Sequence, residues 1–306
     1  MAKRYYNLER ETKEYLKYCS NNNITPSGSI KSINDSVITQ KALGTWRSWT
    51  SLLVDSDAAA YIRAVQAADG QALESGVVSA IDAFVKGCKS DGIWTAIKAS
   101  CILSGARTLT GALVPLVGTA PTNNNFVSGD YNRETGLVGN ASTKYLNSNR
   151  NNNADGQNDQ HGSAYLSTVG NQNQAFLTGG TNAEGTTSLI KETTSPTQFG
   201  FRSRSSSFVS FGATLQAGFA GISRSEGTTV NARSNGTTKG FTLSSASPLN
   251  ANFFVFARNN TNSGGTSPTA YADSRISFYS IGSALTLSSL DSRVSTLISA
   301  IDAAIA

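Results

Sequence analysis

Residues 252–258 read Asn-Phe-Phe-Val-Phe-Ala-Arg and residues 274–282 read Ser-Arg-Ile-Ser-Phe-Tyr-Ser-Ile-Gly, and these two stretches decide the fold of the chain. Both are β-branched and aromatic runs between Asn, Gly and Pro turns, a pattern typical of strands. The first is apolar on both faces and fits a central strand. Alternation in the second predicts that Ile276 and Phe278 face one side and Tyr279 the other.

Short runs of the same kind recur at roughly 8–12-residue spacing through the second half of the chain. Dipeptides such as Asn235-Gly236 and Gly264-Gly265 between them are typical of hairpin turns. No helical periodicity interrupts the runs, which favours an antiparallel two-sheet sandwich over a barrel. Besides the two opening stretches, the predicted strands are 137–138, 143–146, 163–168, 175–177, 188–191, 198–202, 208–211, 219–223, 229–232 and 240–243.

The first third of the chain contains a repeat. Residues 13–103 align with themselves at a shift of 48, which places Gly44-Thr45-Trp46 over Gly92-Ile93-Trp94. Each unit reads as a short helix, a turn, an amphipathic helix, a Gly in a left-handed C-cap, and a further helix with Trp in its first turn. Two interpretations of the paired Trp residues remain open: packing in the core of a small bundle, or binding of a ligand.

These patterns together predict an α+β chain. Residues 1–107 form a helical module of two repeats (a duplicated helical hairpin), 108–129 an extended connector, 130–285 the β-sandwich and 286–306 a C-terminal helix. Apolar residues repeat every three to four positions along that last helix. The stripe either packs on the helical module or forms a self-association seam in an oligomer.

Composition narrows the classes of function. The net charge of +5 is spread along the chain without a basic block, which argues against nucleic acid binding. Three cysteines without a CxxC pair indicate neither a zinc site nor a disulfide framework. The first residues lack the apolar run of a secretory signal, and no apolar run is long enough to insert into a membrane, so we expect synthesis and release in the cytoplasm.

The sequence offers no catalytic arrangement. His161 is the one histidine of the chain, and Asp159 and Ser163 beside it cannot complete a triad from the same strand, so we expect a strand-edge residue. The acidic residues of the second half are scattered, without the paired carboxylates that glycosidases need. We therefore expect that the chain is not an enzyme and that it has no catalytic residues.

Two binding chemistries remain. Residues 151–156 (Asn-Asn-Asn-Ala-Asp-Gly) copy the opening of a calcium loop, but Gly162 stands where a bidentate Glu belongs, so calcium is the only cofactor left open. Tyrosines can stack on sugars while arginines donate hydrogen bonds, and Tyr131 and Tyr271 share this chemistry. The residues selected as candidate glycan contacts are Tyr145, Tyr165, Arg202, Arg204 and Arg258.

Three passages add a resemblance: residues 84–94 (Phe-Val-Lys-Gly-Cys-Lys-Ser-Asp-Gly-Ile-Trp), 131–146 (Tyr-Asn-Arg-Glu-Thr-Gly-Leu-Val-Gly-Asn-Ala-Ser-Thr-Lys-Tyr-Leu) and 275–282. In this order, before a terminal helix, they resemble structural virion proteins of tailed bacteriophages, common in cyanophages. In that group a short helical module precedes a concanavalin A-like (laminin-G-like) sandwich, a jelly roll. The resemblance covers roughly residues 80–306 and implies no catalytic residues.

The resemblance implies a structural role in the phage particle, in capsid decoration or in the tail and its appendages. We then expect other virion proteins and copies of the same chain as partners. The helical part would dock on the virion and the sandwich would be exposed or bridge neighbours. The alternative is an adhesin that binds host surface glycans, and a polysaccharide-degrading enzyme is the third reading.

Overall fold

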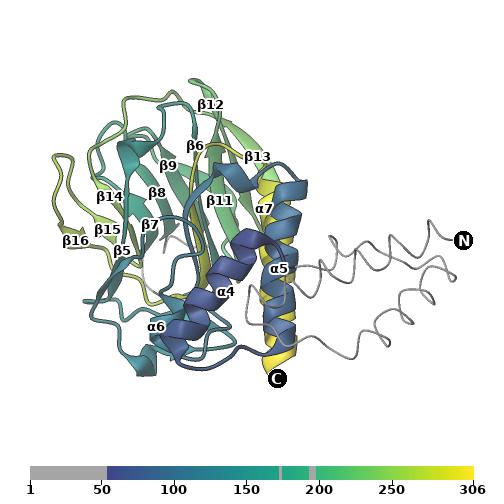
Figure 1. Cartoon of the computed structure of the whole chain (residues 1–306). Helices are drawn as coiled ribbons and strands as arrows, with labels where there is room; N and C mark the ends of the chain where they lie inside the picture. The colour runs from purple at the N-terminus through teal and green to yellow at the C-terminus, as the bar shows by residue number, and fades with distance from the viewer. Residues whose placement is uncertain (1–53, 172–173, 193–197) are drawn as a thin grey trace, which may run out of the picture. The chain divides into compact units, whose positions relative to one another are not determined.

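Two antiparallel sheets packed face to face, with helices on one side, form the described part of this computed structural model (Figure 1). The described residues are 54–171, 174–192 and 198–306. They confirm the predicted α+β class and the sandwich. The first copy of the predicted repeat, with Trp46, lies outside the described residues.

The sheet next to the helices, sheet A, contains eight strands in the order β13-β12-β11-β6-β17-β4-β3, with β1 also paired to β17. The long strand β17 therefore lies inside this sheet, with paired strands on both sides. The strands are β1 (Ile97–Ile102), β3 (Tyr131–Asn132), β4 (Gly136–Val138), β6 (Gln160–Thr168), β11 (Gly218–Arg224), β12 (Thr229–Ser234), β13 (Thr237–Thr242) and β17 (Arg275–Gly282).

The second sheet, sheet B, has the order β10-β9-β8-β7-β14-β5-β2, and a small β15–β16 hairpin joins it through β7. Its strands are β2 (Thr122–Asn124), β5 (Tyr145–Asn151), β7 (Gln174–Gly179), β8 (Thr187–Glu192), β9 (Gln198–Ser203), β10 (Val209–Thr214), β14 (Asn252–Val255), β15 (Arg258–Asn259) and β16 (Pro268–Thr269). Every strand predicted from the sequence has a counterpart in one of the two sheets.

The core between the sheets is rich in aromatic residues. Phe199 lies 6.1 Å from Phe176 and 5.9 Å from Phe211, measured between ring centroids. Small residues of sheet A, such as Ala164 and Ala220, face these rings. Burying large rings against a flat, small-residue face removes much apolar surface from water, and this burial is the main force that holds the sheets together.

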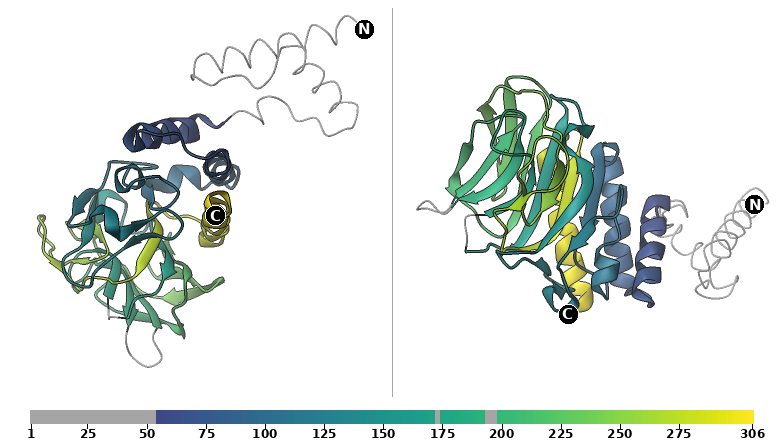
Figure 2. Two further views of the ribbon diagram at one scale, coloured as in Figure 1. Left: turned by 90° about the horizontal axis from the view of Figure 1, so that it is seen from below. Right: turned by 90° about the vertical axis from the view of Figure 1, so that its left-hand side faces the viewer.

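Helices cover the outer face of sheet A (Figure 2). They are α4 (Ser56–Asp69), α5 (Ser75–Ser90) and α7 (Leu287–Ile305), and a short α6 (Leu109–Ala112) packs against α4. Phe84 of α5 meets Phe278 of β17 edge-on, with ring centroids 5.7 Å apart. The left-handed Gly92, with φ +71°, follows the end of α5 as the sequence predicts.

The C-terminal helix α7 packs on α5 and on strands β11 and β12. Its apolar stripe is buried within the chain, from Leu287 through Val294 to Ile301. Of the two interpretations of this stripe, the structure therefore supports packing against the helical part. Ion pairs flank the contact, because Arg293 holds Asp91 and Arg233 of β12 holds Asp291.

The prediction of a helix directly after Gly92 is wrong. The chain after Gly92 makes only a short 3-10 turn at Trp94–Ala96 and then forms strand β1. Residues 97–102 pair with the free edge of β17, where Ala99 and Cys101 face the sandwich core. Tertiary pairing thus overrides the helical reading. Trp94 is half-buried rather than part of the core, so core packing is not its role here.

Both opening stretches contain an irregularity. The first strand ends at Val255, because Phe256 takes a left-handed φ of +70° and the chain turns back into β15. In β17 the register shifts between Ile276 and Phe278. This bulge places Tyr279 in the core with Ile276, whereas Phe278 faces the helices, so the predicted alternation is wrong from residue 278 on.

The boundaries predicted at residues 107, 129 and 285 remain a prediction about how the chain divides. In the structure, residues 55–306 form one compact unit. The predicted connector contains α6 and strand β2. Glu74 at the start of α5 forms ion pairs with Arg107 and with Arg133, which ties the helical segment to the sandwich segment.

Candidate functional site

The outer face of sheet B, which points away from sheet A and the helices, carries a row of residues in register. Phe254 pairs with Thr178, Thr178 with Ser188, and Ser188 with Arg202. Residues directly opposite one another on neighbouring strands point to the same side of a sheet. Phe253 and Val255 belong to the core, so the row with Phe254 lies on the other side.

Aromatic rings border one end of this row. The ring of Tyr145 on β5 lies 4.6 Å from that of Phe254 and 6.3 Å from that of Tyr271. Phe254 is fully buried, whereas both tyrosines are half-buried and reach solvent. Burial raises the pKa of Tyr145, and the neighbouring Tyr271 adds to this effect. The two tyrosines form a neutral, partly open aromatic surface.

Two arginines belong to the same face: Arg202 stands at the β9 end of the row, and Arg258 of β15 lies beside β7. Arg202 of β9 packs its guanidinium over the ring of Phe208, 5.2 Å from the centroid, and its Nε donates to the carbonyl of Ser206 at 3.0 Å. Burial lowers the pKa of Arg202, repulsion from the nearby Arg258 lowers it further, and Glu192 opposes both. Burial also lowers the pKa of Arg258. The two guanidinium groups are therefore close enough to repel each other.

Polar atoms of this face are left unsatisfied. The hydroxyls of Thr178 and Ser188 and Nε of Arg258 are buried without a hydrogen-bond partner among the described residues. Both hydroxyl-bearing residues are 0% exposed. Each buried polar group without a partner costs roughly 1–3 kcal/mol. We call Tyr145, Tyr271, Thr178, Ser188, Arg202 and Arg258 the arginine–tyrosine face.

Three of the five residues selected from the sequence, Tyr145, Arg202 and Arg258, thus meet on one face. Tyr165 lies elsewhere, because it pairs with Phe278 in sheet A on the side that α7 covers. The hydroxyls of Thr178 and Ser188 were missed by sequence reasoning. Only their register, Ser188 beside Arg202 and Thr178 beside Ser188, distinguishes them from other strand hydroxyls.

Arg204 has a different environment from Arg202. It is 1% exposed, and its guanidinium donates to the backbone carbonyl and the side-chain oxygen of Asn152. Burial lowers the pKa of Arg204 to about 10. Enclosed in this way, Arg204 anchors the Asn-rich loop at residues 151–156. Its selection as a glycan contact stays a prediction.

The Asn-rich loop also bears on the calcium interpretation. Its one carboxylate, Asp155, forms an ion pair with Arg150, whose Nε donates to Oδ2 at 3.0 Å. The side chain of Asn152 donates to the carbonyl of Gly185 at 2.9 Å. The side-chain oxygens of Asp155 and Asn152, which could coordinate a cation, therefore already accept hydrogen bonds from arginines. Across the described residues, no group of three or more His, Cys, Asp or Glu side chains is placed to hold a metal ion.

His161 is not at a strand edge, which corrects the sequence-based expectation. It lies in β6 between β11 and β17 and is fully buried. Its Nδ1 is 2.6 Å from the carbonyl oxygen of Ser283, and its Nε2 is 2.7 Å from the hydroxyl of Ser280. Burial lowers the pKa of His161 to about 4. This histidine is neutral near pH 7 and joins the end of β17 to the sheet.

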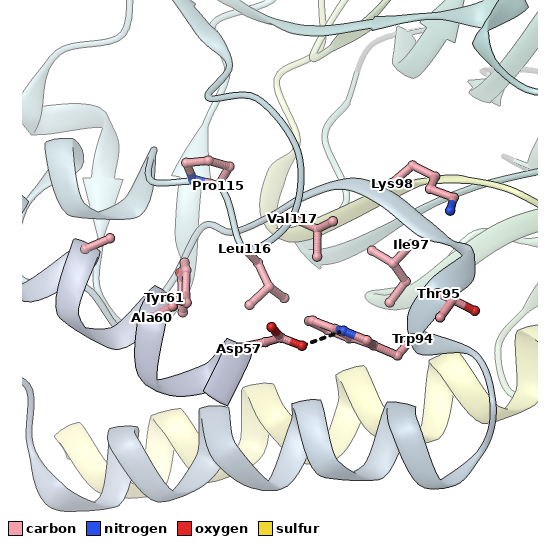
Figure 3. A pocket seen from close by; sticks show the side chains of 11 residues that line it. Asp57, Ala60, Tyr61, Trp94, Thr95, Ile97, Lys98, Pro115, Leu116 and Val117 are labelled. Carbon is pink, nitrogen blue, oxygen red and sulfur yellow. Dashed lines mark hydrogen bonds between the residues drawn. The ribbon is translucent and has the colours of Figure 1, made fainter. Parts of the chain in front are cut away.

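A pocket of about 510 Å³ opens beside α4 (Figure 3). Its walls include Tyr61, Trp94 and Leu116. Nε1 of Trp94 donates to the carboxylate of Asp57 at 3.0 Å, and Lys89 forms an ion pair with the same carboxylate. The polar groups of Trp94 and Asp57 are thus already paired. The pocket offers an apolar surface, with few free groups to select a ligand.

Comparisons with protein families and with curated proteins find no match. Among solved structures, a heptameric SAP-like pentraxin from Limulus polyphemus aligns at 10% identity and a TM-score of 0.33, covering 44% of this chain and 68% of that one. Domain 4 of an extracellular arabinanase from Geobacillus stearothermophilus, in complex with arabinotriose, aligns at 15% identity and a TM-score of 0.34, covering 64% of this chain and 97% of that one.

Sialidases are also among the similar structures. A Trypanosoma rangeli sialidase mutant aligns at 10% identity with a TM-score of 0.39, covering 72% of this chain and 39% of that one. The chain spans 24% of the length of the NanB sialidase from Streptococcus pneumoniae, at 17% identity, 46% coverage of this chain and a TM-score of 0.35. Similarities this low transfer neither a ligand nor a reaction to the chain.

The sequence-based expectation that the chain is not an enzyme is nevertheless corrected. Solved structures that align with it include sialidases and an arabinofuranosidase, so the comparisons do not exclude catalysis. None of the helices in the described ranges is long and apolar enough to span a bilayer.

Proposed function

We propose that the protein binds carbohydrate through the arginine–tyrosine face. The observation that carries the proposal is that an aromatic surface and two arginine side chains lie on the same face of sheet B. Half-buried tyrosine rings stand at one end of the row, and two arginines, which form no ion pair with a carboxylate among the described residues, lie farther along the same face.

Sugar chemistry fits both surfaces. A pyranose ring has an apolar face of C–H groups that packs on aromatic rings, as Tyr145 and Tyr271 offer. Its hydroxyl oxygens accept hydrogen bonds, and each guanidinium presents several donors in a fixed plane. The unpartnered hydroxyls of Thr178 and Ser188 lie buried directly beneath the same face. A mostly apolar surface with a few convergent polar groups is typical of a ligand site.

The position of the face in the fold supports the same reading. The β15–β16 hairpin and the helices α5 and α7 lie on opposite sides of the sandwich in Figures 1 and 2. A ligand on sheet B therefore does not compete with contacts made by the helices. The helical side of the protein remains available for contact with a partner protein.

A glycan array probed with the full chain tests this proposal. We expect binding to at least one class of surface polysaccharide, and loss of that binding in Tyr271→Ala. Trp94→Ala is the matched control, because Trp94 is a half-buried aromatic residue on the helical side. If no glycan binds, the proposal fails. If Trp94→Ala abolishes binding and Tyr271→Ala does not, the site is the pocket beside α4 instead.

We further propose that the protein is a structural component of a bacteriophage particle, assembled in the host cytoplasm with other virion proteins and copies of itself. The three passages that resemble phage proteins support this, because they pack together: Phe84 meets Phe278, and Leu137 pairs with Ile276. They thus belong to one structural unit rather than to three unrelated motifs. Mass spectrometry and electron cryomicroscopy of purified particles test it, and absence of the chain from purified particles overturns it.

A further inference from the structure

Arg202 and Arg258 are two neighbouring positive charges on the same face. Across the ranges that the structure describes, neither guanidinium takes part in an ion pair, although Arg107, Arg133, Arg150, Arg233 and Arg293 all do. Two like charges in a partly desolvated place repel each other, and each loses hydration. A fold tolerates such a pair most easily where a ligand of opposite charge completes it.

The acidic groups nearby form no ion pair with either arginine in the described ranges. Glu192 on β8 acts on Arg202 electrostatically without forming an ion pair. Glu184 is engaged with Ser206, whose hydroxyl donates to its carboxylate. The two guanidinium groups therefore remain without an ion-paired carboxylate among the described residues.

The neutral polar groups of the face point to the same ligand chemistry. The hydroxyls of Thr178 and Ser188 and Nε of Arg258 lack partners, and all three can donate a hydrogen bond. Asn259 pairs with Gly179, so the neighbouring Arg258 comes close to Thr178. Donors that lack acceptors favour a group that only accepts. A carboxylate or a sulfate is such a group.

We propose that the arginine–tyrosine face selects an acidic glycan, whose carboxylate or sulfate group is held between Arg202 and Arg258. The inference rests on the proposed carbohydrate binding and adds the charge of the ligand to it. A planar guanidinium matches the two oxygens of a carboxylate or sulfate in a bidentate contact. Four strand spacings of about 4.8 Å separate β9 from β5, so further units of the same oligosaccharide, rather than the acidic sugar itself, contact the tyrosines. Uronic acids and sulfated sugars share this chemistry.

The experiment compares four probes against the full chain by affinity electrophoresis: polygalacturonate for carboxylate, dextran sulfate for sulfate, and dextran and galactan as neutral polymers. We expect an acidic polymer to bind and added salt to weaken the binding, because screening reduces contacts between charges. Arg202→Gln and Arg258→Gln are each expected to lower the affinity by about tenfold, since each removes a charge-assisted contact.

The controls separate charge from geometry and from folding. Lys98→Gln removes one positive charge from an exposed position on β1 and should leave binding unchanged. Arg202→Lys keeps the charge without the planar fork, so its loss should be smaller than that of Arg202→Gln. Thermal unfolding is the second readout, because an acidic ligand should raise Tm in the parent chain and less in Arg258→Gln.

The possible outcomes test the selection of an acidic glycan separately from carbohydrate binding itself. Equal binding of neutral and acidic polymers that neither arginine variant reduces overturns this inference and leaves carbohydrate binding standing. If no polymer and no arrayed glycan binds, the proposed function fails as well. Loss in Lys98→Gln equal to that in Arg202→Gln shows nonspecific attraction to the net charge and also overturns the inference. Binding by one acidic probe alone distinguishes carboxylate from sulfate.

Discussion

His161 on β6 accepts a hydrogen bond at Nε2 from the hydroxyl of Ser280 on β17, over 2.7 Å, while its Nδ1 donates to the carbonyl of Ser283. The ring thereby connects the middle of sheet A to the segment that leads into α7. Both bonds suit the neutral tautomer with the proton on Nδ1. A second proton would have to enter a site without solvent, which is why burial lowers the pKa to about 4.

We expect this histidine to make the folded state less stable in mild acid. Its pKa is about 4 in the folded state and about 6.5 in the unfolded chain. Between these values the unfolded chain binds a proton that the folded protein excludes, so stability is full above about pH 6.5 and falls as the pH drops toward 4. From pH 7 to pH 5 the loss should be about 2 kcal/mol.

Chemical denaturation of the parent chain and of His161→Gln at both pH values measures this effect. The variant should be less stable at pH 7 but should lose little further stability at pH 5. Carboxylates with lowered pKa values, such as that of Glu74, contribute at lower pH and do not obscure this window. An equal loss of stability in the variant would show that another group is responsible.

The strands could be predicted from the sequence because a half-buried strand has a local signature, alternating or continuous apolar residues between turns. The strand at residues 97–102 could not be predicted in this way, because it forms by pairing with an edge of β17, which is far away in sequence. The bulge in β17 and the left-handed Phe256 are equally non-local. Register and packing settle such details, and neither can be read from one segment.

The residues of the candidate site could likewise be predicted only in part. Tyr145, Arg202 and Arg258 could be selected by residue type, since aromatic rings and guanidinium groups carry recognisable chemistry. The same criterion selected Arg204, which is 1% exposed, because residue type does not report burial. Thr178 and Ser188 gave no signal at all. They matter only through their places in the row between Phe254 and Arg202.

Gly136 on β4 is a position where a methyl group should be strongly destabilising. Its φ is +92°, and a Cβ there would lie 2.3 Å from the carbonyl oxygen of Ile276, a backbone atom that cannot move aside. Gly136→Ala should lower the free energy of unfolding by about 3–5 kcal/mol. Gly236→Ala is the control, because Gly236 has a φ of +72° but nothing within 4 Å. It should cost only about 1 kcal/mol.

Thermal and denaturant unfolding of the two glycine variants distinguish backbone strain from collision. Similar losses in both would show that the left-handed conformation alone sets the cost. In that case the close approach of β4 to β17 would be looser than the structure indicates.

The ion pair between Arg233 and Asp291 should hold α7 on the sandwich. Nε of Arg233 donates to Oδ2 of Asp291 at 2.7 Å, and the hydroxyl of Ser295 donates to the other oxygen at 3.0 Å. Asp291 is 8% exposed. Asp291→Asn leaves Arg233 without its charge partner and should cost about 2 kcal/mol. Asp302→Asn, at an exposed position of the same helix, should change stability by less than about 0.5 kcal/mol.

Hydrogen exchange along α7 locates the effect of Asp291→Asn. Faster exchange should be confined to α7 and to the strands beneath it, β11 and β12. Uniformly faster exchange over the whole chain would mean that the helix unfolds only together with the sandwich. Unchanged exchange and stability would contradict a role of this pair in docking the helix.

Arg202 and Arg204 are two residues apart and should separate binding from folding. Arg204→Gln removes the buried guanidinium that holds Asn152, and leaves the backbone carbonyl of Asn152 without its donor. We expect a loss of about 3 kcal/mol in unfolding free energy. Arg202→Gln removes a half-buried guanidinium whose hydrogen bond goes to Ser206, and should cost less than about 1 kcal/mol.

Denaturation and glycan binding, measured on both variants, should therefore give opposite rankings. Arg204→Gln should show the larger loss of stability, and Arg202→Gln the larger loss of affinity per folded molecule. The same ranking in both measurements would contradict this separation, and would place the ligand on the Asn-rich loop that Arg204 supports.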